Sequence, residues 1–450
     1  LRKARLSAAW FMSRCRWCRQ RSMVTAVRVR IIRPRGFSSP STSCRRRLPM
    51  NNAVMGNYGR IDLAFDHGEG SWLITAYGDR YLDCASGIAV NTLGHAHPAL
   101  VEAVREQAGK LWHVSNLYRI PEQEEVAAML VDLAGMDRAF FCNSGAEATE
   151  GAVKMARRAM HHRGETGRHT ILCSEGAFHG RTIAMLAATD RPAFREGFGP
   201  MPDGFEHFPF GNMNALRDRL VEDAESGSPE IAAIMVEQVQ GEGGAKPLPE
   251  GFLGQLRALC DEFGCLLIAD EVQIGVGRSG HLFSFEPEGI RPDIVAMAKG
   301  LAGGFPVGAV LTSEEVATAM TPGSHGSTFG GNPLAMVAAR AVLGVLTGDG
   351  FMAGVRQRST RLMGMLHAIA ADHDHAFTPR GQGFLIGLVM AEPYQAGDVV
   401  AALRDGGVLS VPASENTVRL LPPLTITDAE IDILANALKK ALSVVDGNRT

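Results

Sequence analysis

Short apolar runs alternate with helical stretches through the middle of this 450-residue chain, from about residue 123 to residue 346. The runs lie at residues 140–142, 171–173, 232–236, 266–269, 294–298 and 309–311. Helical stretches such as 146–163 and 251–263 separate them. Continuous apolar strands are buried on both faces, and helical crossovers join parallel neighbours. The pattern therefore predicts an α/β fold with a mostly parallel sheet.

The segments on either side of this region predict a second, smaller α+β domain. Residues 72–83 read as two strands around a Gly-Asp turn, and a helix is expected at 98–111. Beyond residue 344 we expect a long helix, strands that include 385–390 and 417–421, and a final helix at 428–445. The predicted division is a basic segment at 1–56, small-domain parts at 57–115 and 345–450, and a large domain at 116–344.

The charge of the chain is divided unevenly. Residues 1–50 hold 14 Lys or Arg and no acidic residue, which leaves 31 basic and 48 acidic residues, a net charge of −17, in the other 400. An acidic body argues against nucleic-acid binding. The first segment could be translated upstream sequence before a start at Met50, a mitochondrial transit peptide, or a basic arm for nucleic acid. We favour the first, which implies a cytoplasmic protein; the second would place it in the mitochondrial matrix.

Neither a membrane span nor a metal site is expected. No apolar run reaches the roughly 18 residues that a membrane span needs, so we expect a soluble protein. Cys15 and Cys18 have CxxC spacing, but no second pair or histidine cluster completes a metal site. The five cysteines beyond residue 50 stand among apolar neighbours, as reduced core cysteines do.

Two polar residues follow neighbouring apolar strands. Lys299 comes directly after the run at 294–298, and Asp270 follows the run at 266–269. Either residue alone would more often be a solvent-exposed polar residue at the end of a strand. Together they are what pyridoxal 5′-phosphate (PLP) requires, because a lysine forms a Schiff base with its aldehyde and a carboxylate keeps its ring nitrogen protonated.

Further polar stretches follow other strands of the predicted sheet, where ligands of parallel sheets bind. Ser144, Gly145 and Ala146 open a helix after the first run, which suits a phosphate, although a plain helix cap has the same sequence. Phe178 could stack on a flat ring or pack in the core, and Arg181 could hold a carboxylate. Glycines and acids also follow at residues 237–244, and a polar, glycine-rich loop spans 325–333.

From about Tyr77 to Leu442 the chain resembles the class III PLP-dependent aminotransferases of fold type I. The resembling phrases are GIAVNTLGH at 87–95, LWHVSNLY at 111–118, REGFGP at 195–200, HGSTFGGNP at 325–333 and RLLPPL at 419–424. Within this class it is most similar to the enzymes that act on N-acetyl-L-ornithine. The sequence departs from the common pattern at Gln238, Ile274 and Val276, none of which is a reacting group.

The resemblance implies a role for each polar segment. Lys299 would carry the Schiff base and move the proton, while Asp270 would pair with the pyridine nitrogen. The other implied cofactor-binding residues are Ser144, Gly145, Ala146, Phe178, Glu271, Val272, Gln273 and Thr328. Arg181 and Ser327 would bind substrate, with Ser327 and Thr328 reaching over from the second subunit of a homodimer. Glu237 would pair with Arg380 as a switch that opens for the α-carboxylate of 2-oxoglutarate.

The implied reaction is transfer of the terminal amine of N-acetyl-L-ornithine to 2-oxoglutarate, which gives N-acetyl-L-glutamate 5-semialdehyde and L-glutamate in arginine biosynthesis. Related enzymes act instead on succinylornithine, ornithine, succinyldiaminopimelate or 4-aminobutyrate. The small residues Gly87, Ile88 and Ala89 stand where ornithine enzymes carry a tyrosine, which favours an acylated donor. A PLP-dependent isomerase or decarboxylase and a nucleic-acid-binding protein remain as alternatives from other classes.

Overall fold

The computed structural model of the chain describes residues 53–447. The predictions for the basic segment, including its CxxC pair and Met50, fall on residues 1–52 and lie outside the described residues. A boundary between two compact units falls after Asp62. Every helix and strand of the described residues belongs to the unit that begins at Leu63.

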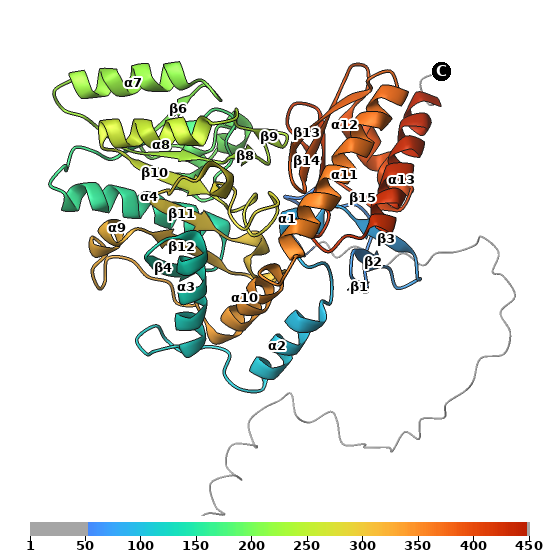
Figure 1. Ribbon diagram of the computed structural model, residues 1–450, viewed down its shortest axis with the longest axis horizontal. Helices are drawn as coiled ribbons and strands as arrows, with labels where there is room; N and C mark the ends of the chain where they lie inside the picture. Colours follow the sequence, from blue (N-terminus) through green and yellow to red (C-terminus); the bar gives the residue numbers. More distant parts are fainter. Residues whose placement is uncertain (1–52, 448–450) are drawn as a thin grey trace, which may run out of the picture. The chain divides into compact units, whose positions relative to one another are not determined.

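A seven-stranded sheet, the largest of this unit, lies to the left in Figure 1, and we call it the central sheet. In spatial order its strands are β4 (Arg138–Cys142), β12 (Gly308–Thr312), β11 (Ile294–Met297), β10 (Leu266–Asp270), β7 (Ile231–Val236), β5 (Thr170–Ser174) and β6 (Phe205–Phe208). Only β12 runs antiparallel to its neighbours. The mostly parallel α/β fold is therefore confirmed, and each of the six predicted apolar runs is a strand.

Both faces of the central sheet are buried. Successive residues of a strand point to opposite faces. Along β10, Leu267 packs into one apolar cluster and Ile268 into another, and along β11 Val295 and Ala296 divide in the same way. The continuous apolar runs follow from this arrangement. The helices of this region are α3 (Pro121–Ala134), α4 (Gly145–His162), α5 (Ile183–Ala188), α6 (Pro192–Arg195), α7 (Met213–Glu225), α8 (Phe252–Phe263), α9 (Glu314–Thr318) and α10 (Pro333–Leu346).

The remaining strands form two four-stranded sheets and one short pair. Their strands are β1 (His67–Glu69), β2 (Trp72–Ile74), β3 (Arg80–Asp83), β8 (Val239–Gln240), β9 (Lys246–Pro247), β13 (Phe377–Gln382), β14 (Leu385–Met390), β15 (Val408–Leu409), β16 (Val411–Ala413) and β17 (Thr417–Leu420). β15 pairs with β3, so strands from before and after the central sheet share one sheet. The domain boundaries at residues 115 and 344 stay predictions.

The other helices lie toward the two ends of the described chain. They are α1 (Ser86–Ala89), α2 (Pro98–Ala108), α11 (Phe351–Asp372), α12 (Ala396–Asp405) and α13 (Asp428–Gly447), and short 3₁₀ turns η2 (Glu286–Glu288) and η3 (Lys299–Ala302) follow β10 and β11. No single helix within residues 53–447 is long and apolar enough to cross a membrane, while α10 and α11, bent by 71°, meet the test of length and composition only as a pair. The five described cysteines are free and buried, as predicted.

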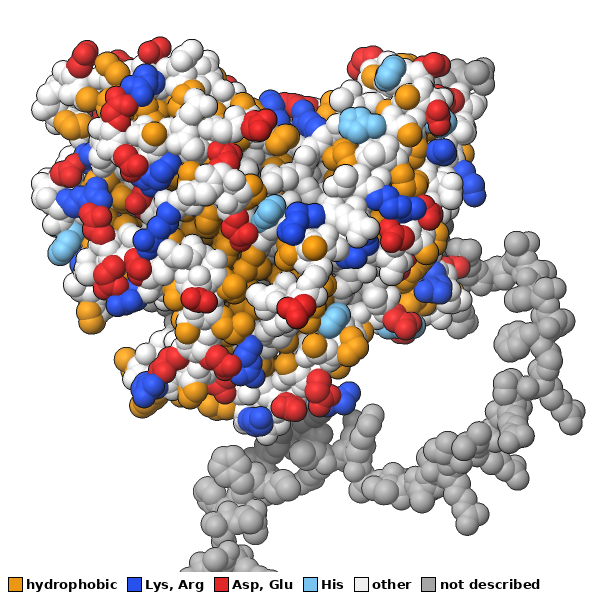
Figure 2. Space-filling view, viewed as in Figure 1, with side chains coloured by type: hydrophobic (Ala, Val, Ile, Leu, Met, Phe, Trp, Pro, Cys, Tyr) orange, Lys and Arg blue, Asp and Glu red, His pale blue; other side chains and the backbone are white. Residues whose placement is uncertain are grey.

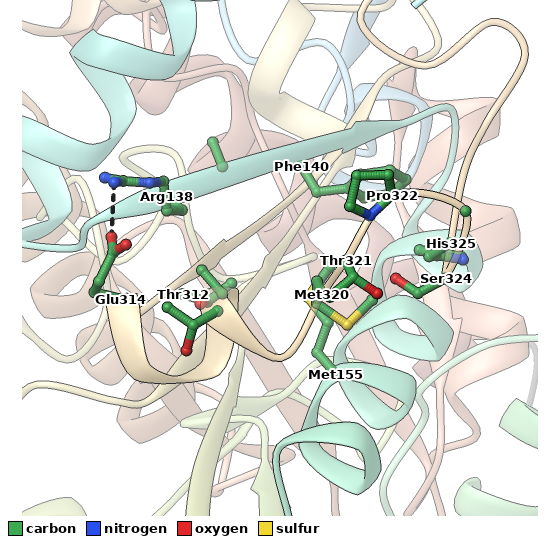
Figure 3. A pocket seen from close by; sticks show the side chains of 14 residues that line it. Arg138, Phe140, Met155, Thr312, Glu314, Met320, Thr321, Pro322, Ser324 and His325 are labelled. Atoms are coloured by element: carbon green, nitrogen blue, oxygen red, sulfur yellow. Dashed lines mark ion pairs between the residues drawn. The ribbon is translucent and has the colours of Figure 1, made fainter. Parts of the chain in front are cut away.

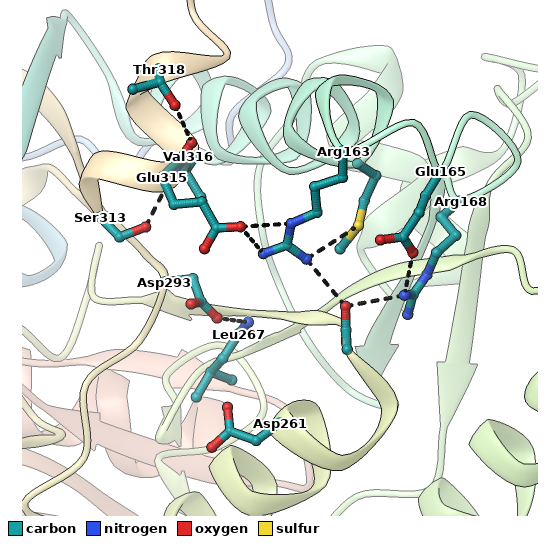
Figure 4. Close-up of polar contacts among 12 residues, drawn as sticks. Arg163, Glu165, Arg168, Asp261, Leu267, Asp293, Ser313, Glu315, Val316 and Thr318 are labelled. Carbon is teal, nitrogen blue, oxygen red and sulfur yellow. Dashed lines mark hydrogen bonds and ion pairs between the residues drawn. The ribbon is translucent and has the colours of Figure 1, made fainter.

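Two arginines close the carboxyl end of α8, where carbonyl groups have no helical partner (Figure 4). Arg168 donates to the carbonyl oxygens of Phe263 and Gly264 at 3.0 and 3.1 Å. Arg163 donates to the Gly264 carbonyl at 3.3 Å and also pairs with Glu315. These contacts fix the turn that leads into β10, the strand that ends at Asp270.

Candidate active site

The carboxyl ends of β10 and β11 bring Asp270 and Lys299 to one edge of the sheet. The two strands are parallel, and Asp270 is in register with Ala296, three residues before Lys299. Parallel neighbours end at the same edge, so the spacing along the sequence becomes proximity in space.

Lys299 begins the turn η3 with a φ of 41°, in the left-handed region that non-glycine residues rarely adopt. Burial lowers the pKa of its amine from the ordinary lysine value to about 8, although the negative charge of Glu242 opposes the shift. Among the hydrogen bonds within residues 53–447, none involves the Lys299 Nζ. A partly dehydrated amine that makes no hydrogen bond, held on a strained backbone, is suited to act as a nucleophile.

A buried histidine holds Asp270. The Nδ1 atom of His179 lies 2.7 Å from the Asp270 Oδ2, while Asp270 Oδ1 accepts from the Val272 backbone N–H at 3.0 Å. Burial alone would lower the pKa of His179, but its hydrogen bond to Asp270 raises it well above the ordinary value. The imidazole therefore fixes the orientation of the Asp270 carboxylate.

Glu237 follows β7 and is almost fully buried. Its two carboxylate oxygens accept from the backbone N–H groups of Phe178, at 2.9 Å, and Gly241, at 3.3 Å. Burial raises the pKa of Glu237 to about 7, with His179 opposing the shift. Glu237 thus joins the loop that carries Phe178 to the loop that follows β7.

The predicted ion pair between Glu237 and Arg380 is wrong, because each side chain contacts other groups. Arg380 Nη2 lies 2.8 Å from Glu415 Oε2, and its Nε donates to the Gly244 carbonyl at 2.9 Å. Its side chain extends from β13 toward these groups, while the Glu237 carboxylate is already satisfied by backbone donors. Within the described residues the two side chains form no ion pair.

A different glutamate–arginine pair lies beside Lys299. Arg419, on β17 and 1% exposed, donates from Nη1 to Glu242 Oε1 at 2.7 Å and to Gln273 Oε1 at 2.8 Å. Burial alone would raise the pKa of Glu242, but the charge and hydrogen bond of Arg419 hold it below the ordinary value. Lys299 contributes to the same lowering, so the pair adjoins the reactive amine.

The amino-terminal end of α4 offers a site for an anion. Ser144 caps the helix through its Oγ, which accepts from the Glu147 N–H at 3.2 Å. The first N–H groups of a helix have no partner within it and favour negative charge. A Cβ on Gly145 would lie 2.7 Å from Val272 Cγ1, so only glycine allows α4 to approach the segment after Asp270 this closely. Ala146 is the second residue of the helix.

Two aromatic rings and a guanidinium group lie close together in the segment that follows β5. The rings of Phe178 and Phe194 meet edge to face at 6.2 Å. The guanidinium carbon of Arg181 lies 3.5 Å from the Phe194 ring centroid and 5.6 Å from that of Phe178. Arg181 is exposed, so its fork of donors is available to a carboxylate.

The loop at 325–333 borders the beginning of α4 from the same chain. Ser327 Oγ accepts from Asn143 Nδ2 at 3.1 Å, and Thr328 is exposed. Both residues line a cavity of about 460 Å³, and Phe140 and His325 line this cavity and a neighbouring one of about 440 Å³ (Figure 3). The structure thus places Ser327 and Thr328 on an open surface beside the predicted phosphate site.

Of the other predicted cofactor ligands, Glu271 is directed to a different partner. Its carboxylate accepts from the Ser284 N–H at 3.0 Å and from the Ser284 hydroxyl. Burial raises the pKa of Glu271 to about 7. Val272 is only partly buried and packs against the Gly145 position, and Gln273 binds Arg419.

Three residues of this site were not predicted from the sequence: His179, Glu242 and Arg419. Each stands in a stretch that was singled out, next to Phe178, five residues after Glu237, and at the start of RLLPPL. The density of acids at 237–244 was a usable signal for Glu242. No local pattern shows that His179 reaches Asp270 across 91 residues of sequence.

The donors at this sheet edge fit PLP. A lysine of lowered pKa whose amine makes no hydrogen bond suits the aldehyde of PLP, and a carboxylate fixed by an imidazole suits its pyridine nitrogen. The beginning of α4, which approaches the segment after Asp270 as closely as only glycine permits, suits its phosphate. Within residues 53–447 no cluster of metal-binding side chains lies here or elsewhere.

Comparison with known proteins agrees with this site. The family model Aminotransferase class-III matches residues 54–442. Acetylornithine aminotransferase of Mesorhizobium japonicum is 50% identical over 389 residues, 86% of this chain and 95% of that protein. The structure is similar to N-acetylornithine aminotransferase of Stenotrophomonas maltophilia, with a TM-score of 0.73 and 34% identity over 85% of this chain and 96% of that one. It is also similar to the ornithine aminotransferase of Toxoplasma gondii, which holds PLP at partial occupancy in its active site, with a TM-score of 0.83 and 30% identity over 88% and 93% of the two chains.

Proposed function

The chain belongs to the class-III aminotransferase family, and from this membership we propose that it transfers the terminal amine of N-acetyl-L-ornithine to 2-oxoglutarate. The products are N-acetyl-L-glutamate 5-semialdehyde and L-glutamate, so the reaction is a step of arginine biosynthesis. It is a PLP-dependent enzyme that takes an amino donor and a keto acid. The observation that carries the proposal is the sheet edge where Lys299, Asp270 and the Glu242–Arg419 pair meet.

PLP supplies an aldehyde that condenses with amines and a ring that withdraws electrons from the neighbouring carbon. We propose that Lys299 would hold this aldehyde and that its amine would move the proton at the reacting carbon. Its lowered pKa, about 8, keeps a useful fraction of the amine uncharged near neutral pH. Asp270, oriented by His179, would keep a proton on the ring nitrogen.

The remaining polar groups bind and orient. The first turn of α4, with Ser144, Gly145 and Ala146, would hold the phosphate, and Phe178, whose loop is fixed by Glu237, would pack against the ring. Gln273, whose Oε1 accepts from Arg419, would donate from its amide nitrogen to the phenolic oxygen of the ring. Arg181, exposed over the Phe194 ring, binds the α-carboxylate of the acylated donor.

We assign the switch between the two substrates to Glu242 and Arg419 in place of Glu237 and Arg380. With the pair closed, Arg419 is neutralised, and a donor reacts through its terminal amine, which carries no adjacent carboxylate. When 2-oxoglutarate enters, Glu242 releases Arg419, which binds the carboxylate next to the keto group. The 2.7 Å contact and the near-complete burial of Arg419 support this assignment.

A comparison of amino donors tests the proposal. Purified enzyme with PLP and 2-oxoglutarate is given N-acetyl-L-ornithine, L-ornithine or 4-aminobutyrate, and L-glutamate formation is measured. We expect kcat/KM for N-acetyl-L-ornithine to exceed the other two by at least tenfold. The exposed Ile88 and the neighbouring Gly87 support this order, because ornithine enzymes resemble one another in carrying a tyrosine there. A preference for L-ornithine would refute the assignment.

We further propose that the enzyme is a homodimer. Large apolar side chains are exposed at Leu111, Trp112, Leu117, Tyr118 and Phe329, which we call the apolar patch. Asn116 ties its two segments together by donating to the carbonyls of Ser327 and Gly330. Hydrophobic side chains also gather between charged ones on the face in Figure 2. Exposed apolar patches of this kind mark protein–protein contacts.

The dimer contact would bring Ser327 and Thr328 to the PLP site of the second subunit. Leu117, the most exposed of the patch at 88%, is the residue to change. Leu117→Asp should give a monomer by light scattering and should retain PLP poorly. Ile433→Asp, at an exposed position of α13, should leave the dimer intact. A dimeric Leu117→Asp variant would contradict this assignment. The cytoplasm stays our proposed compartment, with the mitochondrial matrix as the alternative.

A further inference from the structure

When the Glu242–Arg419 pair opens, one of its two side chains has to move. Glu242 lies in the loop after β8 and is the more exposed partner, at 27% against 1% for Arg419. Arg419 also donates to Gln273 Oε1 at 2.8 Å, a contact that holds its guanidinium where it is. Glu242 is therefore the partner that moves.

The backbone of the loop after β8 is held in position. Arg380 donates to the carbonyl oxygens of Gly243 and Gly244 at 3.3 and 2.9 Å. The carbonyl of Glu242 accepts from the Ser414 backbone N–H at 3.2 Å. A Cβ on Gly244 would lie 2.5 Å from Arg380 Nη2, so glycine lets the guanidinium lie against the loop. Because three successive carbonyls are held, Glu242 leaves Arg419 by rotation of its side chain.

A cavity of about 230 Å³ offers the space for this rotation. Its lining comes from the segment around α6, from the loop after β8, and from β16 with the residue after it: Arg191, Phe194, Glu242, Pro412, Ala413 and Ser414. One water needs only about 10–15 Å³, so the cavity has room for a carboxylate and its hydration. The Glu242 side chain can turn into this space without displacing other protein groups.

Arg191 places a positive charge on the wall of the same cavity. It donates from Nη2 to the Gly176 carbonyl at 3.3 Å and from Nη1 to the Ser414 hydroxyl, and its buried Nε has no partner. Among residues 53–447 it forms no ion pair. While the Glu242–Arg419 pair is closed, the Arg191 guanidinium is thus anchored at the wall without a counterion.

We propose that Arg191 receives the Glu242 carboxylate when 2-oxoglutarate opens the pair, so that Glu242 exchanges one arginine for another. The inference rests on the function proposed above and adds a positioning residue that sets the affinity for the keto acid. A carboxylate that leaves its partner inside a protein loses several kcal/mol unless a second cation meets it. Arg191 supplies that cation and so raises the population of the state in which Arg419 is free to bind substrate.

The test compares the two half-reactions of wild type and Arg191→Gln. The first is kcat/KM for N-acetyl-L-ornithine with no keto acid present, and the second is kcat/KM for 2-oxoglutarate with enzyme that has already taken up the amine. We expect the second value to fall about tenfold, the effect of one charge-assisted hydrogen bond, and the first to stay within threefold. Arg191→Lys keeps the charge and should retain most of the second value. Arg217→Gln, which removes an exposed arginine of α7, is the matched control and should change neither value.

The Glu242→Gln background separates this role from a purely structural one. It has no carboxylate for Arg191 to receive, so adding Arg191→Gln should change the 2-oxoglutarate value less than threefold. Equal losses in the two backgrounds, equal losses in both half-reactions of a folded Arg191→Gln enzyme, or no loss at all would overturn the proposal.

A second variant covers a folding defect at Arg191. Ala413→Leu leaves Arg191 in place and narrows the cavity into which Glu242 turns. It should lower the 2-oxoglutarate value and spare the N-acetyl-L-ornithine value; an unchanged 2-oxoglutarate value would overturn the proposal.

A binding measurement keeps this inference apart from the proposed function. Glutarate is a diacid without a keto group, so it can bind at Arg419 but cannot react. A wild type that uses neither substrate would refute the proposed function, and calorimetric binding of glutarate to the PLP-loaded enzyme would still decide the role of Arg191. Binding about tenfold weaker in Arg191→Gln supports that role, and equal binding overturns it.

Discussion

Replacing Glu242 by glutamine tests the assigned switch, because it removes the charge that holds Arg419 while keeping the size of the side chain. Arg419 Nη1 lies 2.7 Å from Glu242 Oε1, and Arg419 is 1% exposed against 27% for Glu242. A hydrogen bond between charged groups contributes about 1.5–3 kcal/mol. Since Gln273 still accepts from Arg419 and Glu242 is partly hydrated, we take about 2 kcal/mol, which corresponds to about 30-fold.

The expected result is a change in donor selectivity. With Arg419 freed, donors that carry a carboxylate beside the reacting amine gain relative to donors that react through a terminal amine. For Glu242→Gln we expect kcat/KM for L-glutamate, divided by kcat/KM for N-acetyl-L-ornithine, to rise about 30-fold. The assay follows each donor separately in the half-reaction, so that the keto acid does not compete.

Glu415→Gln is the matched control, because it releases the other arginine, Arg380, from a glutamate at a similar distance of 2.8 Å. Its selectivity ratio should stay within threefold of the wild type. The reasoning would be refuted if Glu242→Gln changed the ratio by less than threefold, or if Glu415→Gln produced the larger change.

Three further predictions concern the cofactor site. Because burial lowers the pKa of Lys299 to about 8, the amine of the apoprotein loses its proton above that value, and the rate of PLP capture should rise through pH 8 and level off by about pH 9; a rise centred near the ordinary lysine value would contradict the burial argument. His179→Asn removes the donor 2.7 Å from Asp270, so the PLP dissociation constant from equilibrium dialysis should rise about tenfold or more, and an unchanged constant would exclude this role. Gly145→Val places a Cβ 2.7 Å from Val272, so it should weaken PLP capture and lower the melting temperature. The control Gly344→Ala, in α10 with open space around it, should leave PLP capture unchanged and raise the free energy of unfolding by about 0.5–1 kcal/mol. Equal PLP capture by the two variants would contradict the close-approach argument.

Six of the seven strands of the central sheet could be predicted, because a strand that is covered on both faces forms a continuous apolar run. β6 was not predicted, since it is an edge strand whose sequence, Phe205 to Phe208, includes a glutamate and a histidine. Lys299 and Asp270 could be placed together because parallel strands end at one edge. This physical rule needs only the order of elements along the chain.

The contacts between distant side chains could not be predicted in the same way. Arg380 and Arg419 both lie in strands of one four-stranded sheet, β13 and β17, and the sequence does not say which one faces Glu242. The choice depends on how that sheet packs against the loop after β8. His179 likewise reaches Asp270 only because β5, β7 and β10 are adjacent.

The most direct measurement of the central claim mixes the PLP-loaded enzyme with N-acetyl-L-ornithine in the absence of any keto acid and follows the visible absorbance of the bound cofactor. The account predicts rapid loss of that absorbance and its return when 2-oxoglutarate is added, as the amine leaves the donor and passes to the acceptor. A persistent absorbance with N-acetyl-L-ornithine, lost instead with L-ornithine or 4-aminobutyrate, would contradict the assigned donor. A protein that takes up no PLP at all would contradict the role of Lys299.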